Sequence, residues 1–361
     1  MTKQKSIILA AGGTGGHLFP AIALGEELIE RGYVVHLITD LRCQKYLTSD
    51  LRLITHIIDF KPDAKSLLKK IKSVTGMMLA TIKALSIIIK SNAAVIIGFG
   101  GYPSFPPMLS GILARIPLVI HEQNCFMGKT NAILARFAKI VALSYKETKN
   151  VNHYQDKIVI TGDIIRNHIR NIPTKNNFNN VPFRILVIGG SQGARIFSTL
   201  IPETITILLA QHPNITLHVT QQVPKEDYSS VNLLYASLGI SYQLSDFFHN
   251  IAELYSNSEL IIARAGASTI AELTTIGLPA IFIPFPHAAE NHQFYNAQAV
   301  QDQKAGWCFE QHSVTPIQIA NKIFELINDR SILTSTSRNL LKRKNKGHKI
   351  LADTVEKIIT D

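Results

Sequence analysis

The chain has 361 residues, of which 46% are hydrophobic and 17% are charged. This length suits two domains of ordinary size, and the composition excludes a disordered or fibrous protein. The net charge of +11 lies mostly in the first half: residues 1–165 carry 20 Lys and Arg against 11 Asp and Glu, and residues 166–361 carry 17 against 15. This asymmetry predicts an anionic partner for the first half, either nucleic acid or an acidic membrane surface.

The first predicted element is a strand at Ile7–Ala11, whose apolar run is too short for a signal peptide. It leads into the loop "GGTGGH" and a helical pattern that Gly32 closes. From Arg184 the stretch "RILVIGGSQGARIF" repeats this plan, and short apolar strands alternate with helical stretches in both halves. The alternation predicts two parallel sheets flanked by helices, with ligands at the carboxyl ends of the strands. Asn and Pro accumulate at Thr161–Pro182, where we expect the domain boundary.

The three cysteines are far apart in the sequence and form neither a disulfide framework nor a zinc spacing: Cys43, Cys125 and Cys308. Their distribution predicts a reducing, cytoplasmic setting. The stretch Asp63–Asn92 is helical in pattern and contains six lysines and one acid. It is either a buried helical segment with a solvated basic face or a basic, apolar patch that docks on an anionic membrane. A spanning helix is not expected, because Gly76 and Lys83 interrupt the roughly 20 apolar residues that this would need.

The first glycine loop, Gly12–His17, lacks the Gly-Lys-Ser/Thr of a P-loop. It also fails the pattern G-x-G-x-x-G, because Leu18 stands where the third glycine belongs. Asp40 follows the second predicted strand, where a dinucleotide-binding acid would lie, so a nicotinamide site stays open as an alternative. Free N–H groups at the start of a helix bind anions, and four glycines exceed what a tight turn needs for packing. The loop therefore predicts an anion site.

Two loops in the second half follow strands in the same way. The loop "GGSQGAR" places the Ser191 hydroxyl beside bare backbone, and "ARAGASTIAE" places Gly266–Thr269 at a helix start with Glu272 one turn later. The latter either binds phosphate and a ribose diol or is an ordinary capped helix with a favourably placed carboxylate. Three such loops in one chain favour a ligand that contains phosphate.

Polar side chains gather in three further places. The segment "PFPHAAENHQFYNA" contains His287, Glu290, Asn291, His292, Gln293 and Asn296. It has no zinc spacing, and the chain has no Asp-X-Asp, so we expect sugar hydroxyls rather than a metal there. The motifs "GFGGY" and "HEQN" follow two strands of the first half. Four consecutive polar residues favour a site, although His121 alone is typical of a satisfied structural histidine.

Taken in order, "GGTGGH", "GFGGY", "HEQN", "GGSQGAR", "RAGAST" with Glu272, and "HQ" before "YNA" resemble the MurG family of bacterial N-acetylglucosaminyl transferases. The resemblance extends from Ile8 to about Gly306. It implies an α/β protein of the GT-B class, with two Rossmann-like parallel-sheet domains that face a central cleft. The N-terminal domain would be residues 1–165, with a C-terminal helix of about 343–361 packing back on it, and the UDP-GlcNAc domain would be residues 166–342.

The implied reaction is an inverting transfer of GlcNAc from UDP-GlcNAc to the C4 hydroxyl of MurNAc in undecaprenyl-pyrophosphoryl-MurNAc-pentapeptide (lipid I), which yields lipid II. The implied donor-binding residues are Thr14, Gly15, Gly16, Asn124, Arg166, Ser191, Phe248, Ala267, Ser268, Thr269, Ile270, Ala271, Glu272 and Gln293, with Glu272 on the ribose. The implied acceptor-binding residues are Gly13, Gly100, Gly101, Tyr102 and Glu122. The first glycine loop would face the lipid pyrophosphate and the reacting sugar.

His17 is the candidate catalytic residue. It either acts as the general base for the acceptor hydroxyl or is a hydrogen-bonding group that only orients the acceptor. The chain departs from the family pattern at "GDIIR", which ends in Arg166, and at "TQQV", which ends in Val223. A glycine-dependent approach of the backbone to a ligand is therefore not expected at Val223.

The resemblance implies UDP-GlcNAc and lipid I as substrates, an anionic surface on the cytoplasmic face of the inner membrane, and other cell-wall synthesis proteins as partners. No nucleic acid, bound metal or other cofactor is expected. The rival function is an isomerase that resembles UDP-GlcNAc 2-epimerases and shares the two-domain architecture. It would need acidic catalytic residues in the cleft and no lipid acceptor. A nicotinamide oxidoreductase is the third alternative.

Overall fold

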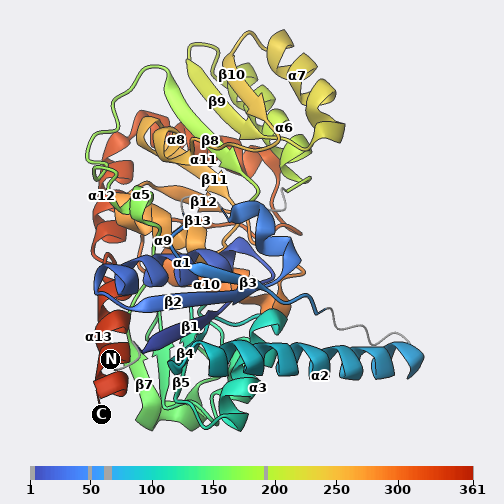
Figure 1. Cartoon of the computed structure of the whole chain (residues 1–361). Helices are drawn as coiled ribbons and strands as arrows, with labels where there is room; N and C mark the ends of the chain where they lie inside the picture. The colour runs from blue at the N-terminus through green and yellow to red at the C-terminus, as the bar shows by residue number, and fades with distance from the viewer. Residues whose placement is uncertain (1–4, 48–50, 61–66, 191–193, 361) are drawn as a thin grey trace. The chain divides into compact units, whose positions relative to one another are not determined.

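The computed structural model describes residues 5–47, 51–60, 67–190 and 194–360, with the backbone alone for residues 67–72. The chain forms two compact units (Figure 1). Unit 1 consists of Met1–Arg166 together with Asn345–Asp361, and unit 2 is Asn167–Lys344.

Unit 1 is built on a seven-stranded sheet in the order β3-β2-β1-β4-β5-β6-β7, with every pair parallel. The strands are β1 (Ser6–Ala10), β2 (Val34–Thr39), β3 (Ile54–Ile57), β4 (Ala93–Gly98), β5 (Leu118–Glu122), β6 (Ile140–Leu143) and β7 (Ile158–Ile160). The α-helices are α1 (Gly15–Glu30), α2 (Leu67–Lys90), α3 (Phe105–Leu113), α4 (Lys129–Leu134) and α13 (Gly347–Thr360).

Alternate residues of β1 enter two different cores, as expected for a strand buried on both faces. Ile7 and Leu9 pack with residues of α1 and α13 on one face, whereas Ile8 packs with residues of α2, α3 and α4 on the other. The C-terminal helix α13 is fastened to α1 by Arg31, which pairs with Glu27 of its own helix and with Asp353 and Glu356 of α13. The end of the chain therefore completes the N-terminal unit.

Unit 2 is built on a six-stranded parallel sheet in the order β10-β9-β8-β11-β12-β13. The strands are β8 (Phe183–Ile188), β9 (Leu217–Gln222), β10 (Ser241–Ser245), β11 (Leu260–Ala263), β12 (Ala280–Phe282) and β13 (Trp307–Cys308). The α-helices are α5 (Asn167–Arg170), α6 (Phe197–Gln211), α7 (Tyr228–Ser237), α8 (Ile251–Asn257), α9 (Ala267–Ile276), α10 (His292–Gln301), α11 (Pro316–Asn328) and α12 (Arg330–Leu341).

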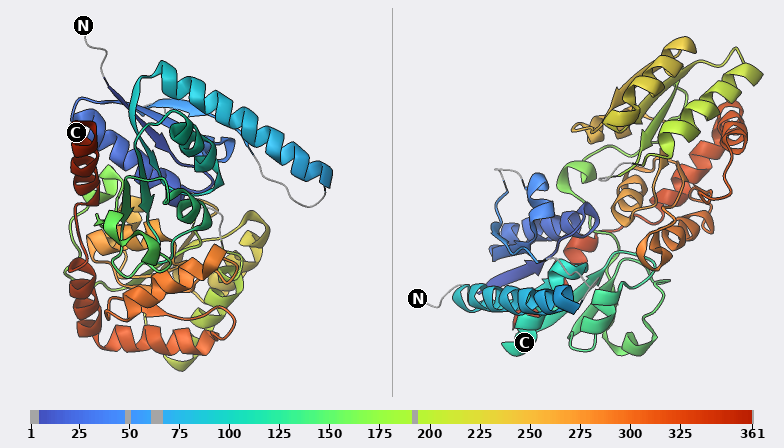
Figure 2. Two further views of the ribbon diagram at one scale, coloured as in Figure 1. Left: turned by 90° about the horizontal axis from the view of Figure 1, so that it is seen from below. Right: turned by 90° about the vertical axis from the view of Figure 1, so that its right-hand side faces the viewer.

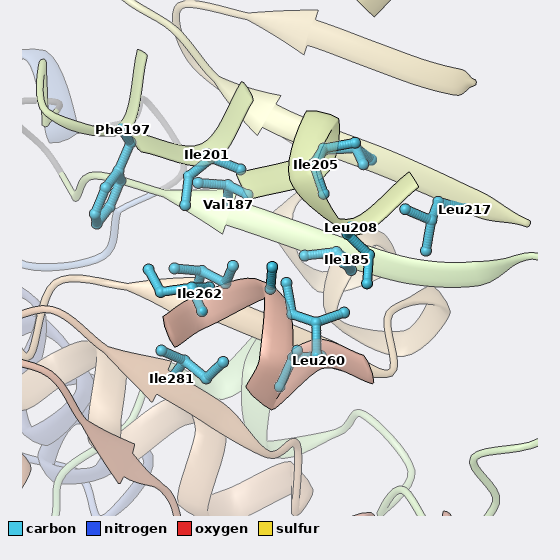
Figure 3. Packing of buried hydrophobic residues seen from close by; sticks show 14 of the residues in the cluster. Ile185, Val187, Phe197, Ile201, Ile205, Leu208, Leu217, Leu260, Ile262 and Ile281 are labelled. Atoms are coloured by element: carbon cyan, nitrogen blue, oxygen red, sulfur yellow. The ribbon is translucent and has the colours of Figure 1, made fainter. Parts of the chain in front are cut away.

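One face of this sheet is covered by α6, whose apolar side chains close the core shown in Figure 3. Phe197 and Ile201 of α6 pack with Val187 of β8 and Ile262 of β11. In both units the strand order reverses beside the strand that begins the repeat, between β1 and β4 and between β8 and β11. Ligands of open parallel sheets bind at such switch points. The predicted α/β class with two parallel sheets is confirmed.

The helix α2 differs from the other long helices in its exposure. In Figure 1 and in the left view of Figure 2, its N-terminal half extends beyond the sheet of unit 1. Ala80, Ala84 and Ile88 are buried against the sheet, but large apolar side chains elsewhere on the helix are exposed. These exposed side chains are Val74, Met78, Leu79, Ile82 and Ile89.

Candidate functional site

The switch point of unit 1 joins the loops that follow β1 and β4. The two loops pack so closely that a side chain on either glycine would be crowded. A Cβ atom added to Gly12 would lie 2.7 Å from Cβ of Pro103, and one added to Gly101 would lie 3.1 Å from the Gly12 carbonyl oxygen. Gly13 and Gly101 adopt positive φ angles of 86° and 74°, which favour glycine. Of the glycines before His17, only Gly16 has no heavy atom closer than 3.5 Å to an added Cβ. The view that four glycines exceed the needs of packing is therefore wrong for most of this loop.

Asp40 is committed to this loop rather than to a dinucleotide ribose. Its Oδ1 accepts the Gly13 N–H at 3.0 Å, and its Oδ2 accepts from Arg42 Nε at 2.6 Å. Burial raises the pKa of this carboxyl, but the hydrogen bonds from Gly13 and Arg42 outweigh it and lower the pKa below its ordinary value. The Arg42 guanidinium also lies 4.6 Å above the centre of the Tyr102 ring. The Gly13 N–H and Asp40 thus hold the predicted acceptor loop in shape.

His17 lies in the first turn of α1, beside the loop that follows β4. A Cβ on Gly101 would lie 3.1 Å from Cδ2 and 3.4 Å from Nε2 of this imidazole. The other ring nitrogen, Nδ1, is hydrogen-bonded to Gln123 Nε2, which also donates to the Phe99 carbonyl oxygen at 3.2 Å. The fold therefore brings His17 together with Gly101 and with the "HEQN" segment after β5.

His121 is completely buried next to this group. Burial lowers its pKa to about 4, against smaller opposing contributions from the Gly162 backbone and the Gln123 side chain. At neutral pH it is an uncharged imidazole packed against Phe99, with 5.4 Å between the ring centres. Neither of its ring nitrogens has a hydrogen-bond partner of good geometry in the described part of the chain, so the structure does not bear out the satisfied structural histidine that the sequence favours for His121 taken alone.

Glu122 organises the loop that follows it. Its Oε1 accepts from the backbone and side-chain amides of Asn124 at 3.0 and 2.9 Å. Its Oε2 accepts from the Gly128 N–H at 3.0 Å and from Asn131 Nδ2 at 2.9 Å. The residue is only 1% exposed, so its carboxylate acts on the predicted site by holding Asn124. A Cβ on Gly100 would lie 3.0 Å from Asn131 Nδ2, which packs the "GFGGY" loop against the same group.

Arg166, the last residue of unit 1 and a predicted donor residue, stacks on an aromatic ring of α1. Its guanidinium lies 4.4 Å above the centre of the Phe19 ring in α1. The "GDIIR" sequence therefore places this cation beside the first turns of α1. Thr14 is the N-cap residue of that helix, and no side-chain hydrogen bond caps the helix there.

In unit 2, Gln222, the last residue of β9, joins the loops that follow β8 and β10. Its Oε1 accepts the Gly189 N–H at 3.0 Å, and its Nε2 donates to the carbonyls of Asp246 at 3.0 Å and Gly190 at 3.4 Å. Phe248, a predicted donor residue two positions beyond Asp246, is only 9% exposed. Ser191 lies outside the described residues. The Val223 N–H donates to the Ser245 carbonyl at 2.9 Å.

The third predicted loop starts α9, with Gly266 as the N-cap. Ser268 and Thr269 are partly exposed, whereas Ile270 is completely buried and its N–H bonds to the Gly266 carbonyl. The side chain of Ile270 therefore faces the core, and its N–H is already used within the helix. Ala267 and Ala271 are also buried. Glu272 is 5% exposed and accepts a hydrogen bond from the Tyr255 hydroxyl at 3.0 Å.

Arg264 holds the neighbouring loops of unit 2. Its guanidinium donates to the carbonyls of Ile283 at 2.9 Å and Pro284 at 3.0 Å, and to Gln311 Oε1 at 2.6 Å. Burial lowers its pKa to about 10, so it remains charged at neutral pH. The next loop is closed by Gln293, whose Oε1 accepts the Phe285 N–H at 2.9 Å. The predicted donor residue Gln293, in the first turn of α10, thus bonds to a loop that a buried cation fixes.

Asn296, which belongs to the polar segment "PFPHAAENHQFYNA", joins α10 to the loop before α9. Its Nδ2 donates to the Ala265 carbonyl at 3.2 Å. Among the residues that the structure describes, no three His, Cys, Asp or Glu side chains form a group that could hold a metal ion.

Two residues that carry this geometry, Gln222 and Arg264, were not predicted as site residues, and Gln123 was predicted only as one of the four polar residues of "HEQN", without a role of its own. Each follows directly on, or ends, a strand at the switch-point edge of its sheet. A polar residue at the carboxyl end of a buried parallel strand is the signal that could have found them.

The fold and these strand-end loops define a two-domain glycosyltransferase of the GT-B class. The model of the glycosyltransferase family 28 N-terminal domain matches residues 7–143, and that of the C-terminal domain matches residues 184–354. The chain belongs to glycosyltransferase family 28 and, within it, to the MurG family.

Its relatives include two proteins named UDP-N-acetylglucosamine--N-acetylmuramyl-(pentapeptide) pyrophosphoryl-undecaprenol N-acetylglucosamine transferase. Those of Rickettsia felis and Rickettsia bellii are each 49% identical, and each match covers 99% of this chain and 100% of the relative. The crystal structure of Acinetobacter baumannii MurG superposes with a TM-score of 0.77 at 28% identity, covering 98% of this chain and 99% of that one. A putative UDP-N-acetylglucosamine 2-epimerase from Listeria monocytogenes shares the fold alone, at 10% identity and a TM-score of 0.69.

Proposed function

We propose that this protein transfers N-acetylglucosamine from UDP-GlcNAc to the C4 hydroxyl of MurNAc in lipid I, with inversion, and so makes lipid II. The observation that carries the proposal is the near full-length match, at 49% identity, to relatives named for this activity. The isomerase alternative has only a likeness of fold at 10% identity. A nicotinamide enzyme loses its candidate acid, because Asp40 is occupied by Gly13 and Arg42.

Unit 2 would bind the donor. The start of α9 presents N–H groups, and the partly exposed Ser268 and Thr269 lie in its first turn, so it can stabilise the departing diphosphate without a metal. Glu272 would bind the ribose from its place beside Tyr255. Gln293 and Phe248, together with Ser191, complete the donor set that the family resemblance implies.

Unit 1 would bind the acceptor. The reaction forms a bond from the acceptor oxygen to the anomeric carbon and breaks the bond from that carbon to the UDP oxygen, so that UDP leaves as an anion and the hydroxyl proton passes to solvent water. His17 lies beside Gly101 in the loop that would hold the acceptor. Asn124 and Arg166, which the resemblance assigns to the donor, also belong to this unit.

The test is an assay of UDP release with UDP-GlcNAc and a short-chain lipid I analogue. The proposal expects release that depends on the analogue and a disaccharide product joined to the C4 oxygen. Release that is no faster with the analogue than without it would refute the transferase function. Formation of UDP-N-acetylmannosamine without an acceptor would instead favour the isomerase.

We also propose that α2 binds an anionic membrane, where the lipid-linked acceptor resides. By length and composition, and despite Gly76 and Lys83, α2 is the one helix in the described part of the chain long and apolar enough to cross a membrane, which differs from the expectation from sequence. Only 22% of its stretch Ser73–Lys90 is buried. Exposed apolar side chains lie beside exposed Lys83 and Lys90, and residues 67–90 include no acid. An apolar face with basic neighbours is typical of a helix that lies on an anionic surface.

Replacing Met78, Leu79 and Ile82 with Ser should weaken binding to vesicles that contain phosphatidylglycerol by roughly 10-fold or more, because three apolar side chains lose their burial in lipid. The control is Leu233→Ser in unit 2, where the side chain is 71% exposed on α7. Sedimentation with vesicles measures both variants. Unchanged binding by the α2 variant would leave α2 without a role at the membrane.

A further inference from the structure

The orientation of one buried amide determines what His17 can do. Gln123 is 5% exposed, and its Nε2 approaches the Phe99 carbonyl oxygen at 3.2 Å and His17 Nδ1. A carbonyl oxygen accepts hydrogen bonds and cannot donate them. The atom that faces Phe99 must therefore be the amide nitrogen, because the amide oxygen in its place would repel the carbonyl.

The same nitrogen faces His17. Since Gln123 Nε2 carries two hydrogens, it can donate one to the Phe99 carbonyl and the other to His17 Nδ1. A ring nitrogen that accepts a hydrogen bond has no proton of its own, so the neutral imidazole carries its proton on Nε2. A proton on Nδ1 would point at an amide N–H, which also disfavours the doubly protonated, charged ring.

We propose that Gln123 is a positioning residue that fixes His17 as the neutral Nε2–H tautomer, so that His17 meets the acceptor as a hydrogen-bond donor rather than as a base. The tautomer stands on the contacts of Gln123, and its use on the acceptor rests on the proposed function. The ring edge that carries Nε2 lies beside Gly101, at 3.4 Å from an added Cβ. An oxygen of the acceptor, on its diphosphate or its sugar, is the group that such a donor binds.

This tautomer decides between the two roles that the sequence leaves open for His17. A general base needs a lone pair toward the hydroxyl that it deprotonates, and the Nε2–H form has none there. A fixed neutral donor instead stabilises negative charge on an oxygen without being reorganised during the reaction. The neighbouring His121 keeps the surroundings uncharged, because it is itself neutral at physiological pH.

The direct test is nitrogen-15 NMR of the full-length protein labelled on histidine, because the shifts of the ring nitrogens distinguish protonated from unprotonated atoms. The His17 signals are assigned by their loss in His17→Gln. We expect an unprotonated Nδ1 and a protonated Nε2 at pH 7. The reverse pattern in the wild-type protein would overturn the proposal.

Gln123→Glu sharpens the test, because a carboxylate can only accept and would demand a proton on His17 Nδ1. The variant should move the proton from Nε2 to Nδ1 and raise the pKa of His17, whereas Gln221→Glu in unit 2 should leave the His17 signals unchanged. A His17 tautomer that stays the same in a folded Gln123→Glu protein would also overturn the proposal. If that variant does not fold, the wild-type spectrum decides alone.

Kinetics supply an independent readout of the same inference. The amide of His17→Gln can donate from a position close to that of Nε2 but cannot act as a base, whereas His17→Ala can do neither. We expect His17→Gln to retain roughly 10-fold more turnover than His17→Ala. Equal losses in both folded variants would contradict the donor role. The NMR measurement needs no substrate. It therefore tests the His17 tautomer independently of the UDP-release assay, which tests the transferase function.

Discussion

The two switch points have the same topology but different chemistry. In unit 1 the carboxyl-terminal ends of β1, β2 and β5, with the segments that follow them, carry ionisable side chains: His17, Asp40, Arg42, His121 and Glu122. In unit 2 the corresponding loops are joined mainly by the neutral amides of Gln222, Gln293 and Asn296. A repeated fold thus fixes where ligands bind, while the residues at the strand ends determine which chemistry is available.

The carboxylates of both sites are buried and already accept hydrogen bonds from groups of the protein. Asp40 accepts hydrogen bonds from Gly13 of the loop after β1 and from Arg42, Glu122 accepts from its own loop, and Glu272 accepts one from Tyr255. Unit 1 uses its charged groups to shape a loop around His17, whereas unit 2 uses one buried cation, Arg264, and several amides. This difference predicts that changes in unit 1 affect turnover and changes in unit 2 affect donor affinity.

The largest expected effect is that of His17→Ala. Turnover should fall by roughly 100-fold or more, because the loss of one fixed hydrogen-bond donor to the developing charge has a cost of this size. UDP binding by isothermal titration calorimetry should be unchanged, since His17 is not among the implied donor-binding residues and Glu272, Gln293 and most of the others lie in unit 2. Near-normal turnover would show that His17 takes no part in the reaction. A weaker affinity for UDP would show that this residue of unit 1 also contributes to donor binding.

The second effect concerns stability and pH. The pKa of His121 is about 4 in the folded protein because the side chain is buried, and an exposed histidine has a pKa of about 6.5. Between these pH values the unfolded chain binds a proton that the folded chain does not, so stability is lost as the pH falls. At pH 5 the loss should be about 2 kcal/mol.

Urea unfolding at pH 7.5 and pH 5 measures this loss. His121→Gln lacks the titrating group and should lose about 2 kcal/mol less between the two pH values than the wild-type protein, whatever its stability at pH 7.5. His36, His56 and His218 also have pKa values lowered mainly by burial, but they remain in both proteins and cancel. The same pH dependence in both proteins would show that His121 does not titrate as a buried imidazole.

The smallest effect separates donor binding from folding in unit 2. Gln222→Leu leaves the Gly189 N–H and the Asp246 carbonyl without their partner, so the loops after β8 and β10 should lose their arrangement. We expect the KM for UDP-GlcNAc to rise by roughly 10-fold, the equivalent of one or two buried hydrogen bonds. The kcat and the KM for the acceptor should change little.

The adjacent Gln221 is a matched control. It is completely buried and bonds to the Phe197 carbonyl and the Tyr235 hydroxyl, which belong to the core. Gln221→Leu should therefore lower the melting temperature without raising the KM for UDP-GlcNAc. If both variants raise that KM equally, Gln222 acts through general stability. Its effect would then be no evidence that the strand-end loops of unit 2 bind the donor.

The amino-acid sequence by itself determined the class of fold, because strands that are apolar along their whole length alternate with amphipathic helices only in parallel α/β proteins. The repeated strand–glycine loop–helix openings also placed the candidate loops correctly at strand ends. Local signals of this kind act over short stretches of chain, so they can be recognised without knowing what packs against them.

The tertiary structure alone decided the state of the individual site residues. Asp40 and Gly13, Gln123 and His17, and Gln222 and Gly189 are each separated by 27 or more residues in the chain. No local pattern reveals that Asp40 is occupied, that Ile270 faces the core, or that Gln123 donates to His17. Such assignments depend on which groups the sheet edge brings within hydrogen-bonding distance, and every buried polar group must find its partner there.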